Sequence, residues 1–287
     1  MENNSKNLLV ETEWLHKNYK NTVILDGSWY LPNQNRDAQK EYIEKHIPNA
    51  LFFDIEDISD KNSQLPHMLP NENDFSLAMK SFGISNNDHI VVYDGIGMQS
   101  AARVWWTFKV FGHEKISILN GGLPKWIHEK KPITHGVEKK PLKSVEAYIS
   151  KLNKKIVRNF QDVYENLESQ KEQVIDARSE GRFKGIEPEP RKNLKAGHIP
   201  KSFNLPYLEL LHPKNKTFLE KKDLLQIFEN KGIDLKQPII TTCGSGITAS
   251  IIFLALSLID HKDISVYDGS WSEWGTKDDS LIEKIIK

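Results

Sequence analysis

The chain has 287 residues, enough for one large domain or two of ordinary size. Lys+Arg and Asp+Glu each number 39, so no basic field indicates nucleic acid or an anionic membrane as a partner. A single cysteine excludes an internal disulfide and a cysteine-based metal cluster. The polar N-terminus and the short apolar run at 247–259 predict neither a secretory signal nor a membrane span. Together these features favour a cytoplasmic protein.

Short apolar runs alternate with helical patterns along the first half of the chain. In chain order, strands are predicted at 22–25, 90–93 and 116–119 and helices at 74–82 and 101–111. The strand runs are nearly continuous, as is typical of strands buried on both faces. The alternation predicts an α/β fold with a mainly parallel sheet flanked by helices.

The second half of the chain repeats the first. The sequences ILDGSW, HIPNALFFDI, IVVYDG and ISILNGGLPKW match VIDARS, HIPKSFNLPY, IITTCG and ISVYDGSWSEW. Four residue pairs are separated by 148 to 152 positions: Asp26 and Asp176, His46 and His198, Asp94 and Cys243, Trp126 and Trp274. A period this long predicts a duplicated domain. The lysine-rich stretch 135–155 is interpreted as the linker between domains at 1–134 and 156–287.

The only cysteine follows a predicted strand of the second repeat. The run IITT at 239–242 ends at Cys243, and Gly244, Ser245, Gly246 and then Thr248 lead into a helical stretch. The glycines allow successive N–H groups to point toward the sulfur, and the helix dipole adds positive charge there. Most free cysteines are small buried hydrophobes, but this context favours a reactive thiol.

The loop does not match phosphate-binding motifs. A tyrosine-phosphatase loop needs an arginine six residues after its cysteine, and Ala249 stands at that position. The chain also contains no GxxxxGK[ST] sequence. These observations disfavour phosphatase and nucleotide-binding functions.

Four sequence features resemble the tandem-domain mercaptopyruvate sulfurtransferases of the rhodanese superfamily. They are CGSGIT from Cys243, the paired HIP motifs, GRFKGIEPEPR at 181–191 and YDGSWSEW at 267–274. The resemblance implies two rhodanese-like domains, the first catalytically inactive and the second catalytic. The repeat indicates the same asymmetry independently, because Asp94 takes the position of Cys243 and a carboxylate cannot carry sulfane sulfur.

The resemblance also implies roles for residues outside the loop. Arg182 and Arg191 would bind the carboxylate and carbonyl of the donor, which suits the forked donors of a guanidinium. His67 and Ser245 would form a proton relay, and Glu56 would be its acid. Asp57 is the alternative acid. Gly244, Gly246 and Thr248 are expected in the substrate-binding loop.

The predicted activity moves sulfur from 3-mercaptopyruvate through a Cys243 persulfide to thioredoxin, a small thiol or cyanide, releasing pyruvate. No metal or organic cofactor is implied. Thiosulfate:cyanide sulfurtransfer is the first alternative; related enzymes with that activity carry Arg and Lys after the cysteine, whereas Gly244 and Ser245 are uncharged. A non-catalytic binding module with the rhodanese fold is the second, and the retained Cys243 argues against it.

Overall fold

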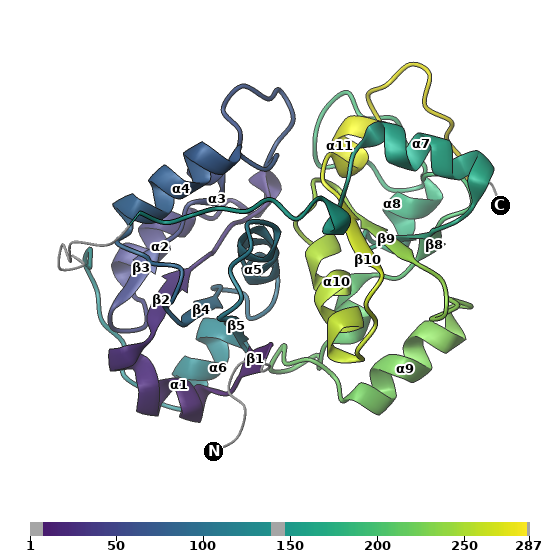
Figure 1. Cartoon of the computed structure of the whole chain (residues 1–287). Coiled ribbons are helices and arrows are strands. Elements are labelled where there is room, and N and C mark those ends of the chain that lie inside the picture. Colours follow the sequence, from purple (N-terminus) through teal and green to yellow (C-terminus); the bar gives the residue numbers. More distant parts are fainter. Residues whose placement is uncertain (1–7, 139–146, 286–287) are drawn as a thin grey trace. The chain divides into compact units, whose positions relative to one another are not determined.

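A computed structural model describes residues 8–138 and 147–285. The chain forms two compact units, each containing one sheet (Figure 1). Of the described residues, the first unit comprises 8–61, 69–138, 147–153 and 213–217, and the second comprises 62–68, 154–212 and 218–285. The predicted linker at 135–155 lies partly outside the described residues, so its boundaries stay predictions.

The first unit contains a five-stranded parallel sheet in the order β1-β5-β4-β2-β3. Its strands are β1 (Leu9–Val10), β2 (Val23–Asp26), β3 (Ala50–Phe52), β4 (Ile90–Tyr93) and β5 (Ile116–Leu119). Its helices are α1 (Thr12–Asn18), α2 (Ala38–Glu44), α3 (Ile55–Ile58), α4 (Glu72–Ser81), α5 (Ala101–Val110) and α6 (Gly122–His128), with 3₁₀ turns η1 (Tyr19–Asn21) and η2 (Pro32–Gln34).

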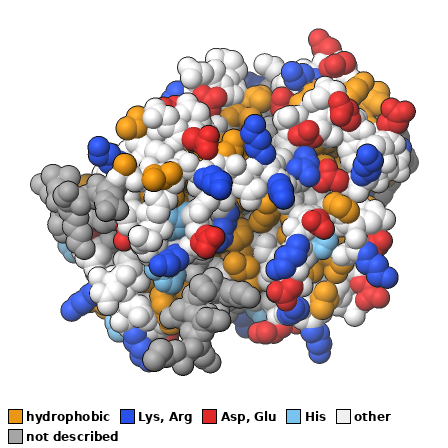
Figure 2. Space-filling view, viewed as in Figure 1, with side chains coloured by type: hydrophobic (Ala, Val, Ile, Leu, Met, Phe, Trp, Pro, Cys, Tyr) orange, Lys and Arg blue, Asp and Glu red, His pale blue; other side chains and the backbone are white. Residues whose placement is uncertain are grey.

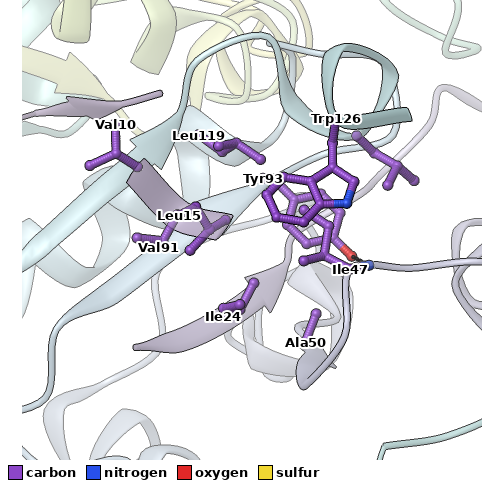
Figure 3. Close-up of a cluster of buried hydrophobic side chains, with 10 residues drawn as sticks. Val10, Leu15, Ile24, Ile47, Ala50, Val91, Tyr93, Leu119 and Trp126 are labelled. Atoms are coloured by element: carbon purple, nitrogen blue, oxygen red, sulfur yellow. Dashed lines mark hydrogen bonds between the residues drawn. The ribbon is translucent and has the colours of Figure 1, made fainter. Parts of the chain in front are cut away.

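The sheet of the first unit is buried by helices. Helix α5 packs against β4 and β5, and nine of its ten residues are buried. Another cluster joins the strands to α1 and α6, with Leu15 and Trp126 packed around Tyr93 (Figure 3). Strands β4 and β5 consist of buried residues throughout, which explains why Ser117 is the one small polar residue in their otherwise apolar sequences.

The second unit has the same topology, with five parallel strands in the order β6-β10-β9-β7-β8. Its strands are β6 (Val157–Arg158), β7 (Gln173–Asp176), β8 (Phe203–Asn204), β9 (Ile239–Thr242) and β10 (Ile264–Tyr267). Its helices are α7 (Phe160–Ser169), α8 (Glu180–Lys184), α9 (Lys221–Asn230), α10 (Ala249–Leu258) and α11 (Ser270–Trp274), with 3₁₀ turns η3 (Lys154–Ile156) and η4 (Tyr207–Leu210).

The equal strand orders confirm the α/β fold with two similar parallel sheets. The predicted strands coincide with β4 and β5 and lie within one residue of β2. Helix α4 begins two residues before its predicted start, because Asn71 caps it by accepting a hydrogen bond from the Asp74 amide at 2.9 Å.

One short segment from each half of the sequence belongs to the unit formed mainly by the other half. Residues 62–68, from the first half of the sequence, belong to the second unit, and residues 213–217 belong to the first. The two segments are about 150 positions apart, so they occupy matching places in the repeat. In the first unit Lys216 packs against Gly97, in the loop after β4.

Charges are mixed on the surface. Basic and acidic side chains are interspersed on the face shown in Figure 2, in keeping with the formal net charge of zero. Within the described residues, no helix has the length and apolar character needed to cross a membrane.

Candidate active site

Cys243 lies directly after β9, in the loop that leads into α10, and its side chain is 2% exposed. Helix α11 holds the backbone of this loop. The Ser270 hydroxyl accepts a hydrogen bond from the Cys243 amide at 3.3 Å, and the Trp271 amide donates to the Cys243 carbonyl at 2.9 Å. The Gly244 carbonyl accepts from the Ser272 amide at 2.8 Å and from its hydroxyl at 2.6 Å. The first two carbonyls of the loop are therefore bound to α11.

The N–H groups of the loop form the second feature of the site. Those of Ser245, Gly246, Thr248 and Ala249 have no acceptor among the residues that the structure describes. Gly246 has a φ of +77°, a conformation that L side chains rarely adopt. Such a turn, placed before a helix, brings successive N–H groups together and favours an anion.

The first unit contains the corresponding loop with its anion built in. Asp94 follows β4 as Cys243 follows β9, and its side chain is 1% exposed. Its carboxylate oxygens accept hydrogen bonds at 2.7–3.0 Å from five backbone amides: those of Ile96, Gly97, Gln99, Ser100 and Ala101. The counterparts of the first four are the amides of Ser245, Gly246, Thr248 and Ala249.

His67 lies in the segment 62–68 that belongs to the second unit. Its Nδ1 is 3.0 Å from the Ser245 hydroxyl oxygen, and both side chains are buried. The φ of His67 is +64°, which is uncommon for a residue with a side chain and is often found where function requires a strained backbone. The structure thus brings together two of the predicted catalytic residues; their role in catalysis stays a prediction.

Arg182, in α8, lies beside the cysteine loop. A β-carbon on Gly244 would come within 3.0 Å of Arg182 Nη2. Glu189 accepts hydrogen bonds from Arg182 Nε at 3.1 Å and Nη2 at 2.5 Å, and its other oxygen accepts from Arg178 Nη1 at 2.7 Å. Within the described chain no hydrogen bond uses Arg182 Nη1. One edge of this guanidinium is therefore fixed by Glu189, and another can face a ligand.

The remaining predicted residues are placed less directly. Arg191 is half-buried in the loop after α8, and its predicted contact with the donor stays a prediction. Glu56 accepts a hydrogen bond from Trp29 Nε1 at 2.9 Å, and Asp57 pairs with Lys61 at 3.1 Å. Both carboxylates belong to the first unit, so the acid of the relay stays open.

Ser270 and Ser272 were not singled out from the sequence, although the repeat contains a signal for them. Gly122 stands at the position of Ser270, with φ values of +54° and +49° respectively. Pro124 stands at the position of Ser272, and proline lacks the N–H that Ser272 donates to the loop. Only the second repeat therefore places hydroxyl groups against its loop at these two positions.

Helix α11 also carries a perturbed acid. Burial raises the pKa of Glu273, whose carboxylate accepts a hydrogen bond from the Tyr267 hydroxyl at 2.9 Å.

In the described ranges, no three His, Cys, Asp or Glu side chains form a group that could hold a metal ion.

Comparisons with known proteins identify the family of the chain. The model of the rhodanese-like domain matches residues 11–129 and 159–277. The 3-mercaptopyruvate sulfurtransferase of Rattus norvegicus is 42% identical over 93% of this chain and 91% of that protein. The thiosulfate sulfurtransferase of Bos taurus is also 42% identical, over 93% of this chain and 91% of that protein. SseA of Escherichia coli, described as a 3-mercaptopyruvate sulfotransferase, superposes with a TM-score of 0.83 at 36% identity, covering 92% of this chain and 99% of that one.

The chain therefore belongs to the rhodanese family, with two copies of its domain. This confirms the resemblance inferred from the sequence and the sulfurtransferase class that it implies.

Proposed function

We propose that the chain carries sulfane sulfur as a persulfide on Cys243 and takes this sulfur from 3-mercaptopyruvate. The observation that carries the proposal is the loop after β9, where a buried thiol precedes N–H groups without acceptors in the described chain. Their counterparts in the first unit bind the carboxylate of Asp94. A persulfide anion on Cys243 would take the place of that carboxylate.

The choice of donor rests on the loop and not on overall similarity. The mercaptopyruvate and thiosulfate enzymes are equally similar to this chain, at 42% identity. Gly244 and Ser245 are uncharged, so the dianion thiosulfate would find no cation at these positions. Mercaptopyruvate is a monoanion and loses less from their neutrality. Its carboxylate would bind Arg182 Nη1, which no hydrogen bond of the described chain uses, on a guanidinium whose Nη2 lies nearest Gly244.

The proposed first step is nucleophilic displacement at sulfur. The Cys243 thiolate forms a bond to the sulfur of mercaptopyruvate, and the carbon–sulfur bond breaks with its electron pair moving to the carbon. The resulting enolate takes a proton at that carbon and becomes pyruvate. The thiol proton of the donor is lost, so Cys243 is left as a persulfide anion and the atoms balance.

Ser245 and His67 are proposed to move that proton. The 3.0 Å separation of the Ser245 oxygen and His67 Nδ1 permits direct proton exchange between them. Gly244, Gly246 and Thr248 are proposed to line the loop around the persulfide, and Arg191 to help Arg182 hold the donor. The first domain is proposed to be catalytically inactive.

In the second step a thiol acceptor removes the outer sulfur and regenerates the Cys243 thiol. Thioredoxin and small thiols are the proposed acceptors, since a thiolate attacks the outer sulfur by ordinary thiol exchange chemistry. A cytoplasmic location is proposed with them, and fractionation with a compartment marker tests it.

The deciding experiment measures kcat/KM for mercaptopyruvate and thiosulfate side by side, with mass spectrometry of the protein after each donor. We expect a mass increase of one sulfur at Cys243, removed by added thiol, and a higher kcat/KM for mercaptopyruvate. A clear preference for thiosulfate would contradict the donor assignment. Absence of the sulfur adduct with either donor would instead support the non-catalytic binding module.

A further inference from the structure

The first unit contains a cavity of about 420 Å³ at the carboxyl ends of β2 and β4. Asp26, the last residue of β2, lines it together with Ser28, Lys45 and Leu123. A cavity of this size can take a small molecule. The residues that line it belong to the catalytically inactive repeat, so the mechanism proposed above does not use them.

The equivalent position in the second unit is filled by an arginine side chain. Asp26 pairs with Tyr93, next to Asp94, and Asp176 pairs with Thr242, next to Cys243, so the two aspartates are structurally equivalent. Two residues further on, the first repeat has Ser28 and the second has Arg178.

The surroundings of Arg178 correspond to the walls of the cavity. The guanidinium bonds to Asp176 at 2.6 Å and to the Gly197 carbonyl at 2.8 Å, and lies 4.1 Å from the centre of the Trp271 ring. The first-repeat counterparts of these three residues all line the cavity: Asp26, Lys45 and Leu123. Hydrogen bonding confirms that Leu123 is the counterpart of Trp271. The Leu123 amide donates to the Asp94 carbonyl, as the Trp271 amide donates to the Cys243 carbonyl.

The first repeat therefore has the same carboxylate, Asp26, but the small side chain of Ser28 stands where the second repeat has Arg178. Asp26 is 2% exposed, and it accepts hydrogen bonds from the amide and hydroxyl of Ser28. Burial raises the pKa of Asp26 to about 6, and its hydrogen bonds with Ser28 and Tyr93 compensate for only part of this shift. Arg36 also lines the cavity, but Glu41 holds it by a forked pair of hydrogen bonds at 2.7 and 2.5 Å.

We propose that this cavity binds a small molecule carrying a guanidinium group, with Asp26 as its counter-ion. The planar fork of a guanidinium matches a carboxylate better than a compact ammonium does, and it is the group that occupies the equivalent space in the second unit. The guanidinium plane lies against Leu123, as that of Arg178 lies against the Trp271 ring in the second unit. The proposal does not depend on sulfur transfer.

Calorimetric titration of the whole protein with ethylguanidinium at pH 7.5 tests this site, with ethylammonium as the matched probe. We expect saturable binding with a Kd below about 1 mM, and binding of ethylammonium at least about tenfold weaker. Ser28→Arg should abolish the binding by supplying the guanidinium from within, and should raise Tm. Asp26→Asn should also abolish it, while Ser28→Ala, which leaves the cavity and the carboxylate, should bind ethylguanidinium within a few-fold of the parent.

Two results with ethylguanidinium would overturn the proposal. One is no saturable binding to the parent protein at 10-fold the expected Kd, about 10 mM. The other is binding that Asp26→Asn leaves unchanged, which would place the cation elsewhere even if Ser28→Arg failed to fold. Equal affinity for ethylammonium would refute the guanidinium assignment. Sulfur transfer by the parent is measured separately, so these failures are distinguishable from failure of the proposed function.

Discussion

The loop after β4 and the loop after β9 lie at the same place in their sheets, but they begin with different side chains, a carboxylate and a thiol. In the first, the Asp94 carboxylate accepts five backbone hydrogen bonds, and in the second a thiol begins the same turn. Both loops have a glycine at positive φ three residues after their first residue, Gly97 and Gly246. The backbone of the first loop therefore binds a carboxylate, and the same turn in the second loop follows a thiol.

This comparison separates two roles that are hard to separate in an active site. Backbone N–H groups stabilise the negative charge of an anion. The side chain at the first position of the loop decides whether that anion can carry a transferable sulfur atom. If Cys243 carries a persulfide as proposed, its outer sulfur would take hydrogen bonds from the amides that correspond to those around Asp94. The most informative changes are those that make one loop resemble the other.

The largest effect is expected from Cys243→Asp, which gives the second loop the side chain of the first. Turnover should fall at least about 1,000-fold, because a carboxylate cannot form a persulfide. The protein should nevertheless fold, since the new carboxylate can accept the amides of Gly246 and Thr248 as Asp94 accepts those of Gly97 and Gln99. Thermal unfolding beside Cys243→Ser measures this: Cys243→Asp should melt at an equal or higher temperature, and a much lower Tm would show that the amides do not converge.

Asp94→Asn should act on stability and not on chemistry. An amide side chain has one acceptor oxygen instead of two, and its NH₂ group would face backbone donors. The loss should be about 3 kcal/mol in the free energy of unfolding, measured by denaturant titration. At a temperature where the variant is folded, kcat/KM should stay within a few-fold of the parent. A loss of several hundred-fold would assign Asp94 a catalytic role.

A smaller effect is expected from Asp26, which lacks the arginine partner that its counterpart Asp176 has in Arg178. Burial raises the pKa of Asp26 from 3.8 to about 6, so folding favours its protonated form. The stabilising contribution of that form is complete below pH 4 and is lost as the pH rises through about 6. Relative to Asp26→Asn, the parent should therefore lose about 2 kcal/mol between pH 4 and pH 7. A pH-independent difference between the two proteins would contradict this assignment.

Arg182→Ala should weaken the use of mercaptopyruvate by roughly tenfold to a hundredfold in kcat/KM, the cost of one charge-assisted contact. The fold should persist, because Glu189 keeps its bond to Arg178 at 2.7 Å. Arg182→Lys should recover only part of the loss, since an ammonium lacks the fork. Undiminished activity in Arg182→Ala would move the anion site elsewhere.

The sequence predicts the repeat and its sheets well, because buried strands such as IVVY leave an unbroken apolar record. It also predicts the turn after β9, where Gly246 has a φ of +77°. The reactivity of Cys243 stays a prediction. The meeting of His67 with Ser245 could not come from local patterns, because 178 positions separate them and segment 62–68 joins the unit of the other half. The pairing of Arg182 with Glu189 was not predicted, because a charged side chain in a loop gives no signal of its partner.

The smallest predicted effect concerns Ser270, where the two repeats differ by one hydroxyl. Its φ of +49° costs about 1 kcal/mol for a residue with a side chain, and Gly122 meets the same requirement in the first unit at less cost. The hydroxyl donates to the Tyr267 carbonyl at 2.8 Å and accepts from the Cys243 amide at 3.3 Å. It thereby fixes the peptide that carries Cys243, the proposed nucleophile, so we expect it to act as a positioning residue.

Ser270→Gly and Ser270→Ala distinguish positioning from a purely structural role. Glycine relieves the backbone cost and alanine retains it, so Tm should be higher for Ser270→Gly than for Ser270→Ala. Both variants lose the hydroxyl, and both should therefore lose about tenfold in kcat/KM for mercaptopyruvate, with the loss mainly in kcat. If Ser270 only supported the fold, activity would follow Tm, and Ser270→Gly would be as active as the parent. Equal losses from two variants of opposite stability would instead tie the hydroxyl to the orientation of Cys243.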